Sequence, residues 1–150
     1  MNLPIIKLEP VAEQDAPALA ELRVRAMRES LERVGRFDAQ RARERFLSGF
    51  SQSHTRHIVR GSSRVGVVVV RPHEAGLLLD HLYLEPDHQG QGLGAAVLAA
   101  VFAEADAQGL SLRVGALRES DANRFYARHG FRVVEQGEWD NYYVRPAGVN

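Results

Sequence analysis

Residues 89–94 read Gln-Gly-Gln-Gly-Leu-Gly, and this hexapeptide lies where a strand-like segment passes into a helix-like one. The apolar run before it is typical of a strand, and Ala95–Gln108 is rich in strong helix formers. The first N–H groups of a helix have no partner within the helix, and the helix dipole makes that end positive. Because glycine removes side chains from the approach to these groups, the pattern favours a phosphate or pyrophosphate cradle over a plain tight turn.

Two common nucleotide-binding motifs fit this loop poorly. The string Gly90-x-Gly92-x-x-Ala95 satisfies the dinucleotide pattern, but that motif normally opens a Rossmann domain, and here about half of the chain precedes it. The dinucleotide fold also needs an acidic residue at the end of the next strand, where residues 113–118 read Arg-Val-Gly-Ala-Leu-Arg. A P-loop is excluded because no Gly-Lys-Ser/Thr follows the glycines.

Composition and charge are those of an ordinary globular protein. The 150 residues suffice for one compact domain, and 45% are hydrophobic while 25% are charged. A formal net charge of zero argues against a general nucleic-acid-binding protein, which needs a basic surplus. The sequence contains no cysteine, so disulfides, cysteine nucleophiles and thiolate metal sites are excluded.

Neither a targeting segment nor a metal site is expected. The first ten residues lack a basic region followed by a long apolar run, and the longest apolar run, Val65–Val70, is far too short to span a bilayer. We therefore expect a cytoplasmic protein without a membrane partner. The histidines show no consistent metal-ligand spacing, so we expect no bound metal.

Hydrophobic periodicity predicts the order of secondary-structure elements. The expected strands are Ile5–Glu9, His57–Arg60, Arg64–Arg71, Gly76–Pro86, Leu110–Leu117, Phe131–Glu135 and Trp139–Arg145. The expected helices begin near Asp15 and near Asp38, and two later ones cover Ala95–Gln108 and Ser120–His129. The order β, α, α, β, β, β, α, β, α, β, β predicts a mixed α/β fold, with one sheet and helices on both of its faces.

Two motifs resemble those of the GNAT superfamily of acyl-CoA-dependent N-acyltransferases. Gln89-x-x-Gly92-x-Gly94, after a strand and before an alanine-rich helix, resembles the family's acyl-CoA-binding motif. Residues 123–131, Asn-Arg-Phe-Tyr-Ala-Arg-His-Gly-Phe, resemble its later N…FY…GF segment. The element order is similar over nearly the whole chain. The resemblance implies a single GNAT-type domain over residues 1–150, with a mostly antiparallel twisted sheet of six or seven strands.

The same resemblance implies how acetyl-CoA binds. The strands near Leu77–Leu84 and Leu110–Leu117 are expected to splay apart, so that the pantetheine arm pairs with backbone groups freed between them. N–H groups of the glycine loop are expected to hold the pyrophosphate. The implied cofactor-binding residues are Leu82, Tyr83, Leu84, Gln89, Gly90, Gln91, Gly92, Leu93, Gly94, Ala95, Asn123 and Tyr126. Core packing by Leu82 and Leu84 and a helix-capping role for Asn123 are the alternatives.

Acyl transfer needs a proton donor for the departing thiolate and a route by which the amine loses its proton. Tyr126 matches the family tyrosine that protonates the thiolate, and aromatic packing is its alternative role. For the base we favour Asp80, which shares a strand face with Leu78 and Leu82. His81 lies on the opposite face and is interpreted as an ordinary hydrogen-bonded histidine. A mechanism without a single base stays open.

The resemblance also places the acceptor near the N-terminal helices, and a late aromatic cluster in the sequence is a second candidate. Residues 25–38 are rich in arginine and glutamate, and residues 139–143 read Trp-Asp-Asn-Tyr-Tyr. A solvated helix face is the alternative for the first segment, and core packing or a dimer contact is the alternative for the second. The candidate acceptor-binding residues are Arg25, Glu29, Asp80, Trp139 and Tyr142.

These observations predict an enzyme that transfers the acetyl group of acetyl-CoA to a primary amine of a small molecule by direct attack on the thioester. The alternatives are an N-acetyltransferase of peptide or protein amino groups and an acyl-CoA-binding module without turnover. A nucleotide-dependent oxidoreductase fits least. We expect acetyl-CoA and an amine as partners and no nucleic acid, and a homodimer stays open.

Overall fold

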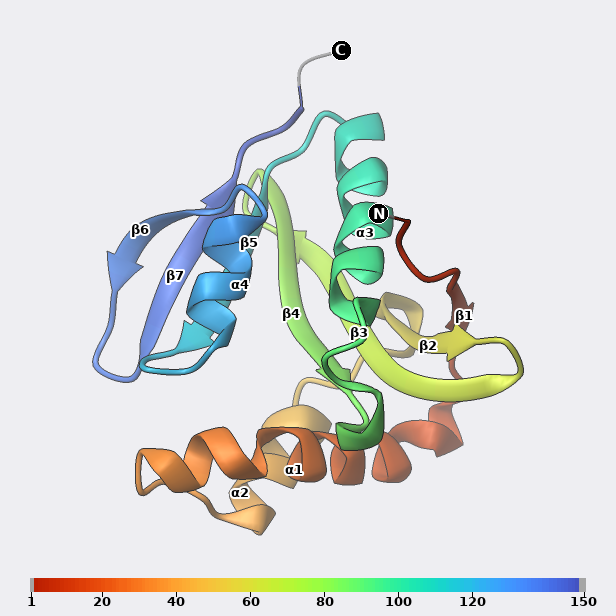
Figure 1. Ribbon diagram of the computed structural model, residues 1–150, viewed down its shortest axis with the longest axis vertical. Helices are drawn as coiled ribbons and strands as arrows, with labels where there is room; N and C mark the ends of the chain where they lie inside the picture. The colour runs from red at the N-terminus through yellow and green to blue at the C-terminus, as the bar shows by residue number, and fades with distance from the viewer. Residues whose placement is uncertain (1, 149–150) are drawn as a thin grey trace. The chain divides into compact units, whose positions relative to one another are not determined.

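The computed structural model describes residues 2–148, and its elements follow the predicted order (Figure 1). The strands are β1 Lys7–Pro10, β2 Thr55–Arg60, β3 Ser63–His73, β4 Gly76–Leu84, β5 Leu112–Leu117, β6 Arg132–Gln136 and β7 Asp140–Arg145. The α-helices are α1 Ala16–Arg33, α2 Ala39–Leu47, α3 Leu93–Ala107 and α4 Ala122–Arg128. The mixed α/β class is therefore confirmed.

The strands form one mostly antiparallel sheet in the order β1-β2-β3-β4-β5-β7-β6. The pairs β1–β2, β2–β3, β5–β7 and β6–β7 are antiparallel, whereas β4 and β5 are parallel. The parallel pairing joins Leu77–Leu79 of β4 to Leu112–Val114 of β5. It thus covers three residues of a β4 strand that continues to Leu84.

The residues group into two compact units, which share the strands β3 and β4 and the helix α3. The first unit holds the residues up to Val69 together with His81–Val97. In it, α1 and α2 lie side by side (Figure 1). Its core joins the two helices to β3, and its buried members are Val11, Leu19, Ala20, Leu22, Phe46, Val67 and Val69. Burial of each of the larger side chains, such as Leu19, Leu22 and Phe46, contributes about 2 kcal/mol to folding.

The second unit holds Val70–Asp80 and the residues from Leu98 onward. Here α4 contacts β5 and β6, and β6 and β7 form a hairpin (Figure 1). The part of α3 in this unit turns Leu98, Val101 and Ala105 into the core, where they are fully buried. This unit therefore presents α4 on a packed support of strands and the end of α3.

Some element boundaries differ from the predicted ones by one or two residues. The first strand is Lys7–Pro10 rather than Ile5–Glu9, because its pairing with β2 begins at Lys7 and leaves Ile5 exposed. The last strand begins at Asp140, which leaves Trp139 outside it. Pairing with a distant strand fixes these ends, and the local sequence does not encode that partner.

Candidate active site

The glycine loop before α3 is open at Gly90, whereas the Pro4 side chain lies beside Gly92, 3.3 Å from where a Cβ atom would stand. β4 ends at Leu84, a 3₁₀ turn follows at Pro86–His88, and α3 begins at Leu93. Gly90 and Gly92 have φ values of 75° and 82°, which other residues rarely adopt. A Cβ atom on Gly90 would meet no atom within 4 Å, so this part of the loop is open. The first intrahelical bond runs from the Ala96 N–H to the Gly92 carbonyl, and the N–H groups before it are those that a helix leaves for an anion.

Side chains from the loop and from the β2–β3 hairpin hold the loop in place. The amide of Gln89 donates to the Leu84 carbonyl at 3.2 Å. The amide of Gln91 donates to the Asp87 carbonyl at 3.2 Å and accepts a 2.7 Å hydrogen bond from Arg60 Nη1. The loop is thus fixed by polar contacts with protein atoms. Sequence reasoning missed Arg60, since no local pattern links residues 31 positions apart.

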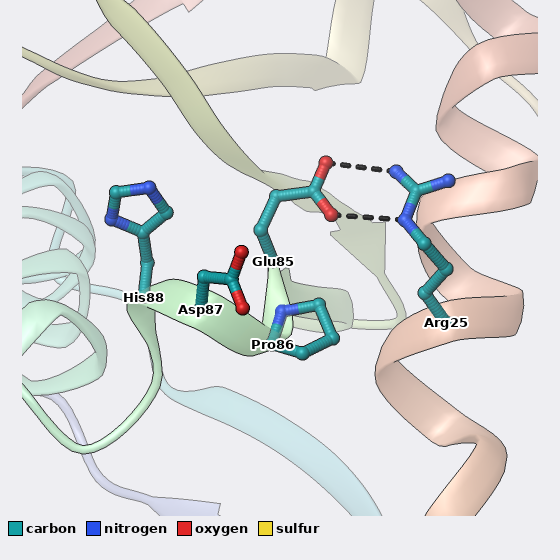
Figure 2. A pocket seen from close by; sticks show the side chains of 5 residues that line it. All are labelled: Arg25, Glu85, Pro86, Asp87 and His88. Carbon is teal, nitrogen blue, oxygen red and sulfur yellow. Dashed lines mark hydrogen bonds and ion pairs between the residues drawn. The ribbon is translucent and has the colours of Figure 1, made fainter.

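Beside the loop, Arg25 and Glu85 form a bidentate ion pair at the edge of a pocket of about 360 Å³ (Figure 2). Arg25 reaches across from α1, with Nε 3.0 Å from one carboxylate oxygen and Nη2 2.8 Å from the other. The hydrogen bonds that Arg25 donates to Glu85 raise the pKa of its guanidinium above the ordinary value. The other lining residues follow β4 directly and are Pro86, Asp87 and His88. Among residues 2–148, nothing hydrogen-bonds the buried Nδ1 of His88.

The inner part of β4 carries a polar chain that faces the two N-terminal helices. Nε of Arg23 in α1 donates to the hydroxyl of Tyr83 at 2.9 Å, and that hydroxyl lies 2.7 Å from Nδ1 of His81. His81 is 4% exposed and its ring packs against Phe46 of α2, with 5.1 Å between centroids. The side chain of Tyr83, predicted as a cofactor-binding residue, therefore belongs to a hydrogen-bond chain with Arg23 and His81. Sequence reasoning missed Arg23 altogether.

Asp80, the predicted base, lies in the second unit. Its carboxylate oxygen is 3.1 Å from Nε of Arg71 in β3, and its side chain is 14% exposed. An amine that approached Asp80 would compete with this guanidinium for the carboxylate. The alternation expected along a strand is present, since His81 on the next position contacts α2 instead.

Tyr126, the predicted acid, lies in α4 with its ring enclosed by aromatic neighbours. Tyr126 is 7% exposed. Phe131 packs on it edge-to-face with 5.3 Å between centroids, and Tyr143 lies at 6.3 Å. This packing orients the ring, and it is compatible with either a structural or a catalytic hydroxyl.

Asn123, one turn before Tyr126, joins α4 to the neighbouring strands. Its Nδ2 donates to the carbonyls of Leu117 and Ser120, both at 2.9 Å. Its Oδ1 accepts from Asn141 Nδ2 at 2.9 Å and from the Tyr143 hydroxyl at 2.8 Å. Among the described residues, the buried Oδ1 of Asn141 has no partner, so it could accept a hydrogen bond from a bound molecule.

The remaining acceptor candidates lie at separate places. Glu29 is exposed and pairs with Arg33 one turn along α1. Trp139 is 45% exposed at the turn before β7. Tyr142 packs on Gly115, where a Cβ atom would lie 3.2 Å from its ring, and the Arg113 guanidinium is 5.0 Å from the ring centroid. The ring of Tyr142 is therefore held by its neighbours.

Within residues 2–148, no group of three or more histidine, aspartate or glutamate side chains is arranged to hold a metal ion. None of the helices in that range has both the length and the apolar character needed to cross a bilayer.

Comparisons with known proteins were made for the sequence and for the fold. The family model described as "Acetyltransferase (GNAT) domain" matches residues 53–133, more than half of the chain. No curated protein sequence matches this chain. The match to the family model includes the glycine loop, Asn123 and Tyr126.

Several solved structures share the fold. An acetyltransferase from Thermus thermophilus is 24% identical, with a TM-score of 0.72 over 97% of this chain and 99% of that one. The PaiA N-acetyltransferase from Thermoplasma acidophilum, solved with coenzyme A, is 18% identical, with a TM-score of 0.70 over 95% and 99%. The ribosomal-protein-S18-alanine N-acetyltransferase from Escherichia coli is 17% identical, with a TM-score of 0.72 over 97% and 96%.

Proposed function

Because this chain belongs to the GNAT acetyltransferase family, we propose that it transfers the acetyl group of acetyl-CoA to a primary amine of a small molecule. The glycine loop carries the proposal. Gly90 and Gly92 adopt positive φ immediately before α3, and Gly90 leaves open space where a side chain would stand. A diphosphate fits this arrangement because the helix start offers N–H donors and a positive dipole end.

The proposed cofactor site continues from the loop toward β4. The N–H groups of residues 90–95 would hold the pyrophosphate, and the backbone of Leu82, Tyr83 and Leu84 would pair with the pantetheine amides. The short pairing of β4 with β5, which covers Leu77–Leu79, supports this reading, since the strand continues beyond it.

Tyr126 is the proposed acid. The amine nitrogen attacks the thioester carbonyl, the carbon–sulfur bond breaks, and the Tyr126 hydroxyl gives its proton to the departing thiolate. A tyrosine suits this step because a phenol with an ordinary pKa near 10 still holds its proton at neutral pH. Asn123 would act by holding α4, and a direct contact of Asn123 with pantetheine stays a prediction. Asp80 is retained as a candidate base, and an amine would compete with Arg71 for its carboxylate.

For the acceptor, the pocket beside Arg25 and Glu85 supports a small charged molecule. The guanidinium could bind a carboxylate and the Glu85 carboxylate could bind an ammonium group. The second candidate is an amino group of a peptide or protein. One enzyme with a similar fold is a ribosomal-protein-S18-alanine N-acetyltransferase, and this likeness favours retaining the second candidate.

Two measurements test the proposal. Isothermal titration with acetyl-CoA should give a binding isotherm in the micromolar to low-millimolar range, typical of substrates. Thiol release should then be followed with a panel of small amines and a panel of short unblocked peptides. No heat of binding at millimolar acetyl-CoA would sink the proposed enzyme, and binding without thiol release from either panel would favour the non-catalytic acyl-CoA-binding module.

A further inference from the structure

Three polar side chains of the first unit form an unbroken hydrogen-bond chain between α1 and β4. Arg23 Nε donates to the Tyr83 hydroxyl at 2.9 Å, and the same hydroxyl lies 2.7 Å from His81 Nδ1. Arg23 is itself held by a 2.9 Å bond from Nη1 to the Ala42 carbonyl in α2. Buried polar groups need hydrogen-bond partners, but the partner of a buried histidine need not itself be titratable. The direct contact between two titratable groups, His81 and Tyr83, therefore calls for a chemical explanation.

The chemistry of the three groups limits where the hydrogens lie. A guanidinium can only donate, so the Tyr83 oxygen is the acceptor of the bond from Arg23. That oxygen has a second lone pair, so its bond with His81 Nδ1 runs in a direction set by the tautomer of His81. Only the tautomer with its proton on Nε2 and a lone pair on Nδ1 allows Tyr83 to pass a proton inward to His81. In that tautomer, the Arg23 cation stabilises negative charge on the Tyr83 oxygen.

Exposure gives the chain a direction. His81 is 4% exposed and covered by Phe46, whereas Tyr83 is only partly buried. Tyr83 is therefore the outer member and His81 the inner one. The chain also joins β4 to α1, which carries Arg25 of the proposed acceptor pocket. Asp80, one position earlier on β4, pairs with Arg71 instead.

We propose that Tyr83 is the proton acceptor for the amine, that His81 receives the proton from Tyr83, and that Arg23 is the positioning residue of the pair. This rests on the proposed function. The N–H bond of the acceptor ammonium breaks and its proton goes to the Tyr83 oxygen, while the Tyr83 O–H bond breaks and that proton goes to His81 Nδ1. The freed lone pair attacks the thioester carbonyl.

The proton count closes over one turnover. An ammonium and acetyl-CoA give an acetamide, the CoA thiol and one proton. The relay takes the first proton from nitrogen and later releases it to solvent. The thiolate takes a proton from Tyr126, which recovers one from the second N–H that nitrogen loses. Direct backbone contact between Tyr83 and pantetheine is compatible with this role, because it uses different atoms.

The first test reads the tautomer and needs no turnover. The ¹⁵N NMR spectrum of the histidine rings, recorded on the full chain at neutral pH, should show His81 neutral, with a bare Nδ1 and a protonated Nε2. Arg23→Met should weaken this preference, whereas Arg41→Met, an exposed arginine of α2, should leave it unchanged. A protonated Nδ1 in the parent protein would overturn the proposal.

The second test uses two amines of similar size and opposite basicity, propylamine and 2,2,2-trifluoroethylamine, with thiol release as the signal. Propylamine is almost wholly protonated at neutral pH and needs a base, whereas the fluorinated amine is largely neutral and does not. Tyr83→Phe should lower kcat/KM at least about tenfold for propylamine and less than about threefold for trifluoroethylamine. Arg41→Met should affect neither, and a melting curve checks the folding of each variant.

The outcomes distinguish a failure of the proton relay from a failure of the proposed function. An equal loss for both amines in Tyr83→Phe indicates a purely structural network and overturns the relay while acetyl transfer stands. No loss for propylamine does the same. If acetyl-CoA binds but the parent protein acetylates neither amine, the proposed function for simple amines fails, and the relay fails with it.

Discussion

Asn123 accepts a 2.8 Å hydrogen bond at Oδ1 from the hydroxyl of Tyr143, which ties α4 to β7. Asn141 of the same strand donates to the same oxygen at 2.9 Å. The two hydrogens of the Asn123 amide go to the carbonyls of Leu117 and Ser120. Protein groups therefore use both donors and the acceptor of this side chain. A motif residue that the resemblance links to the cofactor here also fixes the helix that carries Tyr126.

Replacement of Asn123 by alanine should mainly destabilise the fold. The change leaves two carbonyls, the Tyr143 hydroxyl and the Asn141 amide without their partner, and each such loss costs about 0.5 kcal/mol or more. We expect Asn123→Ala to lower the free energy of unfolding by about 2 kcal/mol, measured by urea denaturation. Arg124→Ala, on the next residue with an exposed side chain, is the control and should change it by less than about 0.5 kcal/mol. A stable variant that has lost acetyl-CoA binding would instead place Asn123 on the cofactor.

Removal of the Tyr126 hydroxyl should slow the chemical step. The ring of Tyr126 is held by Phe131 and Tyr143, so phenylalanine should occupy the same position. We expect Tyr126→Phe to lower kcat at least about tenfold and to change the Kd of acetyl-CoA less than about threefold, because the hydroxyl acts on the transition state. Steady-state kinetics and calorimetry measure the two quantities.

The matched control for Tyr126 is Tyr143→Phe, which removes a neighbouring hydroxyl. The two rings lie 6.3 Å apart, and the Tyr143 hydroxyl is bonded to Asn123. Loss of the Tyr143 hydroxyl should affect the free energy of unfolding more than it affects kcat. An unchanged kcat in Tyr126→Phe would assign Tyr126 to packing alone.

Gly90 gives a direct test of the phosphate cradle. Gly90→Ala should raise the Kd of acetyl-CoA at least about fivefold, because alanine at positive φ costs about 1 kcal/mol or more and reshapes the loop. Gly61→Ala in the β2–β3 turn is a closely matched control, with φ of 63° and no atom within 4 Å of an added Cβ. Calorimetry should show weaker binding only for the first variant. Equal binding by both variants would argue against a ligand at this loop.

The parts of the site that the sequence predicted are those encoded by local pattern. The glycine loop is predicted from neighbouring residues alone. Strand alternation places Asp80 and His81 on opposite faces of the strand without any knowledge of the fold. The polar partners are different. Arg23 meets Tyr83 across 60 positions of sequence, and Arg60 meets Gln91 across 31. Such pairs follow from the packing of distant elements, and one sequence does not contain that information.

The same limit applies to the fold. The order and type of the elements follow from hydrophobic period and from glycine and proline positions, whereas the place of β7 between β5 and β6 does not. Nothing local in Asp140–Arg145 says that it pairs with both neighbours. The exposure of Ile5, predicted as a strand residue, has the same origin.

The pocket beside α1 predicts which kinetic constant its residues control. The Arg25 side chain is 48% exposed, and an exposed ion pair contributes about 1 kcal/mol or less, so a charged acceptor can displace Glu85 at little cost. Arg25→Met should raise the KM of a carboxylate-bearing amine at least about fivefold and leave the KM of acetyl-CoA unchanged. Initial rates with alanine and with alanine amide measure this. A similar change for both amines would show that Arg25 does not read the carboxylate.

The last prediction concerns stability and pH. Asp106 near the end of α3 forms a two-pronged ion pair with Arg145 of β7, at 2.9 and 3.1 Å, and accepts a bond from the Gly148 N–H. The hydrogen bond from Arg145, followed by that from Gly148, holds the pKa of Asp106 below its ordinary value of 3.8. A carboxylate with a depressed folded-state pKa contributes stability above its unfolded-state pKa, and that contribution is lost as pH falls through the folded value.

Asp106→Asn should therefore lower the melting temperature at neutral pH and flatten its decline in acid. Melting curves between about pH 6 and about pH 2 should show the two proteins converging as the pH falls through the folded-state pKa of Asp106, which lies below 3.8. Asp121→Asn, with an exposed side chain on the surface, is the control for loss of a charge alone. Parallel curves for the parent and Asp106→Asn over the whole range would mean that the ion pair with Arg145 adds nothing to folding. The link between α3 and β7 would then depend on other contacts, such as the cation–π contact of the Arg145 guanidinium, 4.0 Å from the centroid of the Phe102 ring.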